Sequence, residues 1–190
     1  RIYSCAQALS QSCINQSIDS DLEQISLNGL SQFKVGGSCT WLYVDDQSKQ
    51  AIIIDPLPEL DQRLQQLLDC QQLDLLAVID THGHADHTSC RGVIAAQFLA
   101  TQQSDALGWP QHSESIKVAG NCYQFFPIGD KYLVKVPTPG HTQDSISLLL
   151  CSSLDDLAID YAFCGDTILM GSLGRTNFTS SSSSDMISSL

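Results

Sequence analysis

Residues 75–79 read LLAVI, and residues 81–88, THGHADHT, follow almost at once. The first stretch is short and fully apolar, which predicts a strand buried between two layers. The second stretch holds three of the five histidines of the chain, together with one acid. These residues are His82, His84, Asp86 and His87. Because functional side chains of layered α/β proteins often lie where a strand ends, we expect a site at this point.

The spacing within this cluster is typical of metal binding. In an extended loop His82, His84 and Asp86 project to the same side, because side chains alternate along an extended chain. Gly83 and Ala85 between them are small and let the chain approach a bound ion closely. Imidazole and carboxylate ligands together suit Zn, Fe or Mn. Packing gives no reason to gather imidazoles here, so we interpret the cluster as part of a metal site.

Two further residues are candidate ligands. His141 lies in the tight turn predicted for PTPGHT, residues 137–142; taken alone it would be interpreted as an ordinary turn histidine, and it becomes a candidate ligand beside the first cluster. Asp166 follows the predicted strand 161–164, where a carboxylate can also cap the next turn. Two histidines and one carboxylate are typical of non-haem Fe(II) enzymes that handle O₂, whereas three histidines and a water favour zinc and hydrolysis. The ligand types leave both metals open.

The rest of the chain predicts interleaved strands and helices, with regular structure beginning near Phe33. The apolar residues of 59–70 recur on one face of a helix. The tail 179–190 contains five consecutive serines and predicts either a linker or the first turn of a helix capped by Asp185. The predicted strands are 39–44, 51–55, 75–79, 115–119, 131–136, 145–150 and 161–164, and the predicted helices are 59–70 and 91–101. This order predicts a layered α/β or α+β domain.

Composition narrows the function classes. The chain has 190 residues, which suits one domain, and its 9 Lys and Arg against 21 Asp and Glu give a net charge of −12. This charge argues against binding to nucleic acid or to an anionic membrane surface. No apolar run approaches the roughly 18 residues of a membrane span. The 8 cysteines include no C-x-x-C pair, so we expect reduced thiols, several of them buried.

The motif residues resemble the metallo-β-lactamase superfamily. THGHADH at 81–87 matches the H-x-H-x-D-H signature, and PGHT at 139–142 and CGDT at 164–167 match the next two metal motifs in the same order. The resemblance covers residues 33–190 and implies an α+β, four-layer αββα fold with the metal site at one edge of the two sheets. We expect residues 1–32 to form an N-terminal extension, partly disordered, and the domain to be incomplete at its C-terminal side.

Within the superfamily, residues 163–178, FCGDTILMGSLGRTNF, resemble the G-D-x-L-L-I-x-G-x-G-R-T-D-F run of persulfide dioxygenases. This resemblance implies one Fe(II) per chain, held by His82, His141 and Asp166. It also implies oxidation of glutathione persulfide by O₂ to sulfite and glutathione. The resemblance implies that the protein is located in the mitochondrial matrix, with the cytoplasm as the alternative compartment. A homodimer is a further expectation.

The resemblance also assigns roles around the metal. His84, Asp86 and His87 would orient ligands and water by hydrogen bonds without binding a second metal. Arg175 would face glutathione, because a guanidinium fork suits a carboxylate, although a structural arginine in a Gly-rich turn is the alternative. The second functional hypothesis is a zinc-dependent hydroxyacylglutathione hydrolase of the glyoxalase II type. A non-catalytic module that binds a partner is the third.

Overall fold

The structure, a computed structural model, describes residues 22–83 and 88–190. The first of two sheets contains β1 (Leu22–Leu27), β2 (Leu30–Val35), β3 (Ser38–Val44), β4 (Gln50–Ile54) and β5 (Asp74–Ile79). These five strands lie in sequence order, and β4 and β5 form the parallel pair of the sheet. Parallel neighbours need a crossover connection, which here includes a helix.

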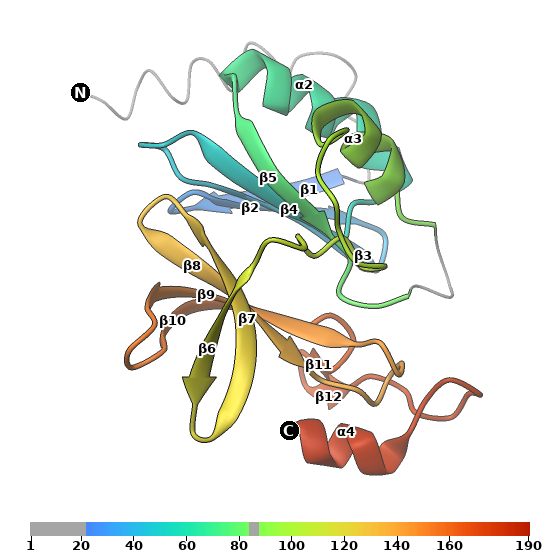
Figure 1. The fold of residues 1–190 in the computed structure, drawn as a ribbon. Helices are drawn as coiled ribbons and strands as arrows, with labels where there is room; N and C mark the ends of the chain where they lie inside the picture. Colours follow the sequence, from blue (N-terminus) through green and yellow to red (C-terminus); the bar gives the residue numbers. More distant parts are fainter. Residues whose placement is uncertain (1–21, 84–87) are drawn as a thin grey trace.

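The second sheet faces the first (Figure 1). It contains β6 (Glu114–Val118), β7 (Asn121–Ile128), β8 (Lys131–Pro137), β9 (Ile146–Ser153) and β10 (Ala158–Phe163). The strands pair antiparallel in the order β10-β9-β8-β7-β6. A separate hairpin of β11 (Ile168–Leu169) and β12 (Ser172–Leu173) follows β10.

Helices cover the outer face of the first sheet (Figure 1). They are the 3₁₀ turn η1 (Pro58–Leu60), α2 (Asp61–Gln71) and α3 (Arg91–Phe98). Leu64 and Leu68, one turn apart on α2, are buried, as is Ile94 on α3. The short helix α4 (Ser183–Ser189) lies on the side of the second sheet and buries Met186.

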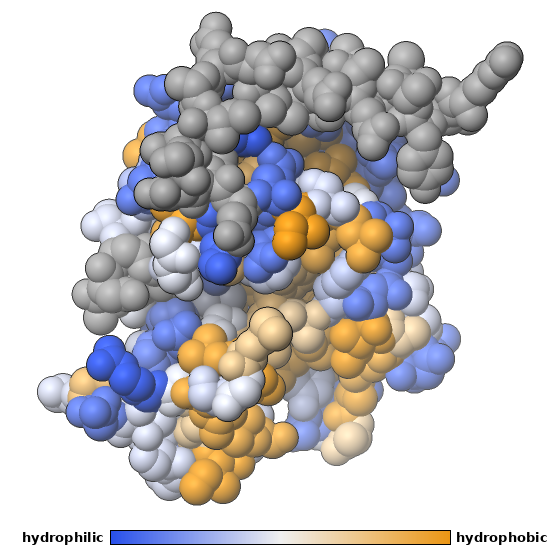
Figure 2. Space-filling model, turned by 180° about the vertical axis from the view of Figure 1, so that it is seen from behind, coloured by the Kyte–Doolittle hydropathy of each residue, from blue (hydrophilic) through white to orange (hydrophobic). Residues whose placement is uncertain are grey.

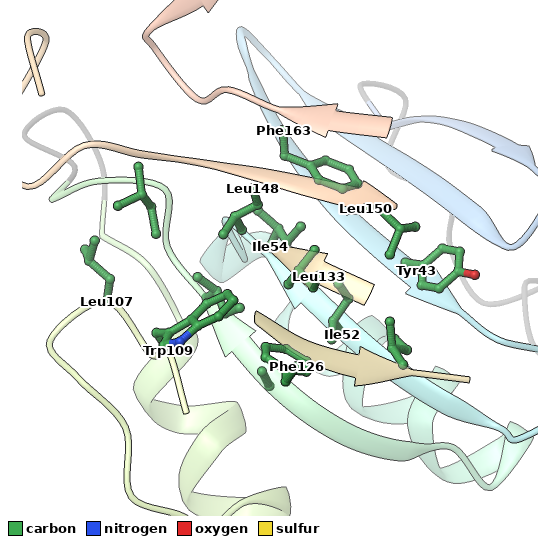
Figure 3. Close-up of a cluster of buried hydrophobic side chains, with 14 of the residues drawn as sticks. Tyr43, Ile52, Ile54, Leu107, Trp109, Phe126, Leu133, Leu148, Leu150 and Phe163 are labelled. Carbon is green, nitrogen blue, oxygen red and sulfur yellow. The ribbon is translucent and has the colours of Figure 1, made fainter. Parts of the chain in front are cut away.

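Strand β4 contributes side chains to two apolar clusters, one on each face of the first sheet. Its side chains alternate between the two faces of the sheet, as in any strand. Ile52 and Ile54 are buried in the cluster between the sheets, whereas Ala51 and Ile53 are buried in the cluster beneath the helices. Figure 3 shows the cluster between the sheets, where Ile52 and Ile54 lie among side chains from both sheets. The first sheet also contributes Tyr43, Ala77 and Ile79, the second sheet contributes Phe126, Leu133, Leu148, Leu150 and Phe163, and Trp109 comes from the segment between α3 and β6.

The predicted elements are largely confirmed. The strands expected at 39–44, 51–55, 75–79, 115–119, 131–136, 145–150 and 161–164 correspond to β3, β4, β5, β6, β8, β9 and β10, and the expected helices 59–70 and 91–101 overlap α2 and α3. The expectation that regular structure begins near Phe33 is wrong, because β1 and β2 place residues 22–32 in or beside the first sheet. Where the domain itself begins stays a prediction.

Two local features differ from the prediction. Strand β7 was not predicted, since Pro127 lacks a backbone donor and weakens the strand pattern. The turn before it, Ala119 and Gly120, has positive φ at both positions, as a type I′ hairpin requires. In the tail a helix forms, but its N-cap is Ser182, whose hydroxyl accepts from the Asp185 backbone at 3.2 Å. The assignment of Asp185 as the cap is therefore wrong.

The cysteines of the described residues are free thiols, and Cys90 and Cys151 are buried. Burial raises the pKa of the Cys90 thiol to about 12, so this thiol stays protonated at neutral pH. Within residues 22–83 and 88–190, no helix has both the length and the apolar character that crossing a membrane requires.

We predict that Leu64→Ala lowers the free energy of unfolding by about 2–5 kcal/mol, because it leaves a cavity between α2 and the first sheet. Leu64 has an exposed fraction of 0%. The matched control is Gln66→Ala on the exposed face of the same helix, which should change stability by less than about 0.5 kcal/mol. Urea unfolding followed by circular dichroism measures both. Equal effects of the two substitutions would contradict the packing described here.

Candidate metal centre

Three side chains from different elements converge where the ends of the two sheets meet. His82 follows β5 of the first sheet, His141 lies in the loop between β8 and β9, and Asp166 follows β10. One ligand atom from each lies within 4.8 Å of the others. The structure therefore brings together three residues that lie far apart in the sequence.

The three side chains differ in exposure. His82 is 5% exposed, the His141 side chain is 12% exposed, and the Asp166 side chain is 46% exposed. His141 Nε2 lies 3.4 Å from Asp166 Oδ2, and the two imidazole rings meet edge to face with centroids 5.0 Å apart. The centre is thus buried on the imidazole side and open to solvent on the carboxylate side.

A backbone carbonyl orients His141. His141 Nδ1 lies 3.0 Å from the carbonyl oxygen of Arg175. Because a carbonyl can only accept, Nδ1 carries the proton and the lone pair of the ring is on Nε2, the nitrogen that faces Asp166. The Phe178 ring packs edge-on against the same imidazole at 5.1 Å between centroids. His141 is therefore held in the tautomer that a metal ligand needs.

A glycine makes the approach of Arg175 possible. A Cβ at Gly174 would lie 1.8 Å from the Asp166 carbonyl oxygen and 3.1 Å from His141 Nδ1. Real Cβ atoms do not come that close to a backbone oxygen. Residue 174 must therefore be glycine if the chain is to pass between two of the candidate ligands.

Asp80 ties together the two ends of the histidine-bearing loop. Its carboxylate accepts a hydrogen bond from Ser89 Oγ at 2.7 Å and one from Arg91 Nε at 2.8 Å. Burial raises the pKa of this carboxyl, and the bonds from Ser89 and Arg91 oppose that rise. These contacts hold Asp80, which comes shortly before His82, against Ser89 and Arg91, which follow it in the sequence.

Asp144 lies beside the centre in the loop between β8 and β9, the loop that also carries His141. Partial burial tends to raise the pKa of its carboxyl, but hydrogen bonds from Thr142 and from the backbone of Gly83 outweigh this, so the pKa lies below its ordinary value. An ionised Asp144 next to the residue that follows His82 adds negative charge near the centre. This favours a bound cation.

Asp55 and Thr81, two buried residues next to His82, were not identified as site residues from the sequence. Asp55 accepts hydrogen bonds from Thr81, and the Thr81 hydroxyl lies 3.0 Å from His82 Nδ1. The available signal was the position of Asp55 at the end of an apolar strand, where a buried acid needs a partner.

The predicted site residues divide into three groups. His82, His141 and Asp166 come together as described. Arg175 has an exposed side chain, and its carbonyl contacts the centre. His84, Asp86 and His87 lie outside the described residues.

The hairpin between Asp166 and Arg175 gives the centre an apolar flank. Four exposed apolar side chains belong to it, Ile168, Leu169, Met170 and Leu173. Figure 2 shows apolar surface in the lower part of the rear face, the region where β11, β12 and α4 lie in Figure 1.

The donor set fits a mononuclear metal ion. Two imidazole nitrogens and one carboxylate oxygen, with further positions open, are the ligands of non-haem Fe(II) enzymes, and the same donor types bind Zn²⁺. The protonated Nδ1 of His141 and the exposed side of Asp166 agree with this use. The geometry can therefore hold one ion and leave room for a substrate.

Comparisons with known proteins agree with this geometry. The family model described as the metallo-beta-lactamase superfamily matches residues 35–190. The crystal structure of ETHE1 from Myxococcus xanthus is similar to this chain with a TM-score of 0.61 and 28% identity, over 88% of this chain and 67% of that one.

The curated relatives include persulfide dioxygenases and hydroxyacylglutathione hydrolases. Persulfide dioxygenase ETHE1, mitochondrial, of Bos taurus is 34% identical over 74% of this chain and 53% of its own length. The cytoplasmic isozyme of hydroxyacylglutathione hydrolase of Saccharomyces cerevisiae is 26% identical over 74% of this chain and 51% of its own length. The chain spans about half the length of these relatives.

We predict that Gly174→Ala weakens binding of Co²⁺ or Zn²⁺ by at least about 10-fold, because the added methyl group must push Asp166 or His141 out of place. The control is Gly92→Ala in α3, where a Cβ meets no atom within 4 Å and should leave affinity unchanged. Isothermal titration of the metal-free proteins measures the affinities. Tight binding by the Gly174 variant would show that the chain does not pass between the ligands as described.

Proposed function

We propose, from the premise that this chain belongs to the metallo-beta-lactamase superfamily, that it is the metal-binding part of a persulfide dioxygenase. The reaction takes glutathione persulfide, O₂ and water to glutathione, sulfite and two protons. The observation that carries the proposal is the convergence of two histidines and one carboxylate within 4.8 Å. The persulfide dioxygenase relatives at 34% and 32% identity support the choice of reaction.

The proposed cofactor is one Fe(II) per chain, held by His82, His141 and Asp166. When bound, the iron supplies the activation of O₂, which amino acid side chains cannot provide. The chain supplies geometry and charge. His141 presents Nε2 because the Arg175 carbonyl accepts its Nδ1 proton, and the Asp166 carboxylate, 3.4 Å from that nitrogen, is the oxygen ligand of the proposed ion.

We propose that the substrate binds at the edge of the metal centre, next to Arg175. Arg175 follows the apolar hairpin and contacts His141 through its carbonyl, so its exposed side chain starts beside the reacting centre. A guanidinium binds a carboxylate through two parallel hydrogen bonds, and glutathione carries two carboxylates. His84, Asp86 and His87 are proposed to orient ligands and water.

The alternative is a zinc-dependent hydroxyacylglutathione hydrolase. The yeast relative at 26% identity supports it, and the donor set also suits zinc. Both reactions use a glutathione thiol derivative, so the edge next to Arg175 would bind the substrate of either enzyme. The metal and the second substrate separate them, because only the dioxygenase consumes O₂.

We propose that the protein is located in the mitochondrial matrix, with the cytoplasm as the alternative. The support is that the persulfide dioxygenase relatives are named as mitochondrial proteins. The homodimer stays a prediction. The net charge of −12 disfavours nucleic acid as a partner.

The deciding experiment measures metal content and turnover together. We expect about one iron per chain and O₂ uptake with glutathione persulfide that yields sulfite. His141→Ala, the control, should lose both iron and O₂ uptake because one of the three ligands is gone. Two zinc ions per chain, with hydrolysis of a glutathione thioester and no O₂ uptake, would overturn the proposal in favour of the hydrolase.

We predict that Arg175→Ala raises KM for glutathione persulfide about 10-fold or more while iron content is unchanged, since a charge-assisted hydrogen bond contributes about 1.5–3 kcal/mol. The backbone carbonyl that orients His141 remains in this variant. Arg63→Ala, distant in sequence and bonded to Gln24, is the control for loss of positive charge and should keep KM unchanged. An unchanged KM in the Arg175 variant would leave this arginine with a structural role only.

A further inference from the structure

Helix α4 packs against the turn formed by residues 139–142, which we call the His141 turn. The Ser182 backbone N–H, at the N-cap of α4, donates to Gly140 O at 2.8 Å. Ser189 Oγ, at the other end of the helix, donates to Pro139 O at 2.7 Å. Both ends of α4 are therefore bonded to adjacent residues of the His141 turn.

The middle of α4 contacts the same turn. Met186 is the buried residue of this helix, with an exposed fraction of 3%. A Cβ at Gly140 would lie 2.6 Å from Met186 Cα and 2.7 Å from Met186 Cβ. Since real Cβ atoms do not approach other atoms so closely, glycine at position 140 is what allows α4 to reach the turn.

A second set of contacts joins α4 to His141. The imidazole is held by the carbonyl of Arg175 and by the ring of Phe178. Thr176 is the next residue after that carbonyl, and its Oγ1 lies 2.6 Å from Ser183 Oγ in the first turn of α4. The segment that orients His141 is therefore bonded to the helix that packs against its turn.

The sequence of α4 gives the helix little stability of its own. It has 7 residues, SSDMISS, of which four are serine and one is aspartate. Isolated helices shorter than about 12–15 residues are marginal in water, and serine and aspartate favour caps and turns over helix interiors. The helix therefore depends on its contacts with the rest of the molecule, and chief among them are those with the His141 turn.

We propose that α4 positions His141, with Met186 and Ser189 as positioning residues, so that docking of this helix and metal binding stabilise each other. The inference rests on the proposed metal centre and adds residues outside its three candidate ligands. An ion that holds His141 fixes the surface on which α4 docks, and the docked helix restricts the positions that His141 can take. By linkage, each event raises the equilibrium constant of the other by the same factor.

Two neighbouring serines of α4 provide a matched test. Ser189→Ala removes the hydroxyl that bonds to Pro139 O, whereas Ser188→Ala removes a hydroxyl that bonds to Ser184 O within the helix, at 3.0 Å. Both changes place alanine in the last turn of the same helix. We expect Ser189→Ala to lower the Co²⁺ affinity of the metal-free protein about 2- to 10-fold, the range for one net hydrogen bond, and Ser188→Ala to leave it unchanged. Isothermal titration measures both.

The outcomes of this comparison separate the inference from the proposed metal centre. Equal affinities of the two serine variants would overturn the inference and leave the centre in place. A parent protein that binds no Co²⁺ would overturn both.

Three further variants test the buried contact. Met186→Ala removes the buried side chain and should weaken Co²⁺ binding about 10-fold or more, as for other residues that orient metal ligands. Met186→Leu keeps an apolar side chain of similar volume and should bind Co²⁺ like the parent. Ile187→Ala is the control for helix propensity, because the Ile187 side chain is 74% exposed, and it should also bind like the parent. Equal affinities of Met186→Ala and Ile187→Ala would contradict the role of Met186.

Hydrogen exchange tests the reciprocal effect of the metal on the helix. The Ser182 N–H donates to Gly140 O, and the Met186 N–H donates to Ser182 O at 3.0 Å, so both amides exchange faster when α4 leaves the turn. In the parent protein we expect saturating Co²⁺ to slow exchange at both amides about 10-fold or more. In Met186→Ala, also at saturating Co²⁺, the slowing should be smaller because the helix no longer docks firmly.

The exchange measurement is independent of the reaction. Exchange at the Ser182 and Met186 amides that is equal with and without Co²⁺ would refute the inference even if dioxygenase activity is found. Slower exchange with Co²⁺ in the parent, and less slowing in Met186→Ala, would support the inference even if that activity is absent.

Discussion

One backbone hydrogen bond joins the two sheets where the candidate ligands meet: the N–H of Ile146, the first residue of β9, donates to the carbonyl of Thr81 at 2.8 Å. His82 follows Thr81 directly, and His141 lies in the loop that leads into β9. The bond therefore fixes the spacing between the first two ligands. The Thr138 and Thr167 hydroxyls, 3.2 Å apart, link the loop before His141 to the residue after Asp166 in the same way.

Much of the fold could be predicted because it depends on local patterns. The apolar run before His82 and the helical spacing of Leu64 and Leu68 are visible in any window of a few residues. The histidine cluster was equally visible in a short window. His141 and Asp166 could be interpreted as ligands only because of this cluster and the family resemblance. The orientation of His141 could not be predicted, since its partner is the carbonyl of residue 175 and every residue has a carbonyl. Asp55 was placed at the end of its strand, but its contact with Thr81 depends on how β4 and β5 pair.

The charge of the chain and the proposed substrate have to be reconciled. A net charge of −12 repels an anionic persulfide at long range, although salt screens this repulsion beyond about 8 Å at physiological ionic strength. At short range the proposed ion and the Arg175 guanidinium would supply positive charge, and the hairpin of β11 and β12 offers apolar surface beside them. Recognition would then depend on groups that act over a few ångströms, which favours selectivity over rapid capture.

The separation of the three ligands along the chain has a consequence for folding. Contacts between residues distant in sequence form late, because closing a long loop costs entropy before any contact compensates for it. His82 belongs to the first sheet and Asp166 to the end of the second, so the pocket is complete only when both halves have docked. An ion that binds the docked state and not the open one stabilises the docked state by mass action. The proposed ion would then stabilise the docked state in addition to any role in the reaction, and the stability of the domain would depend on the concentration of free metal.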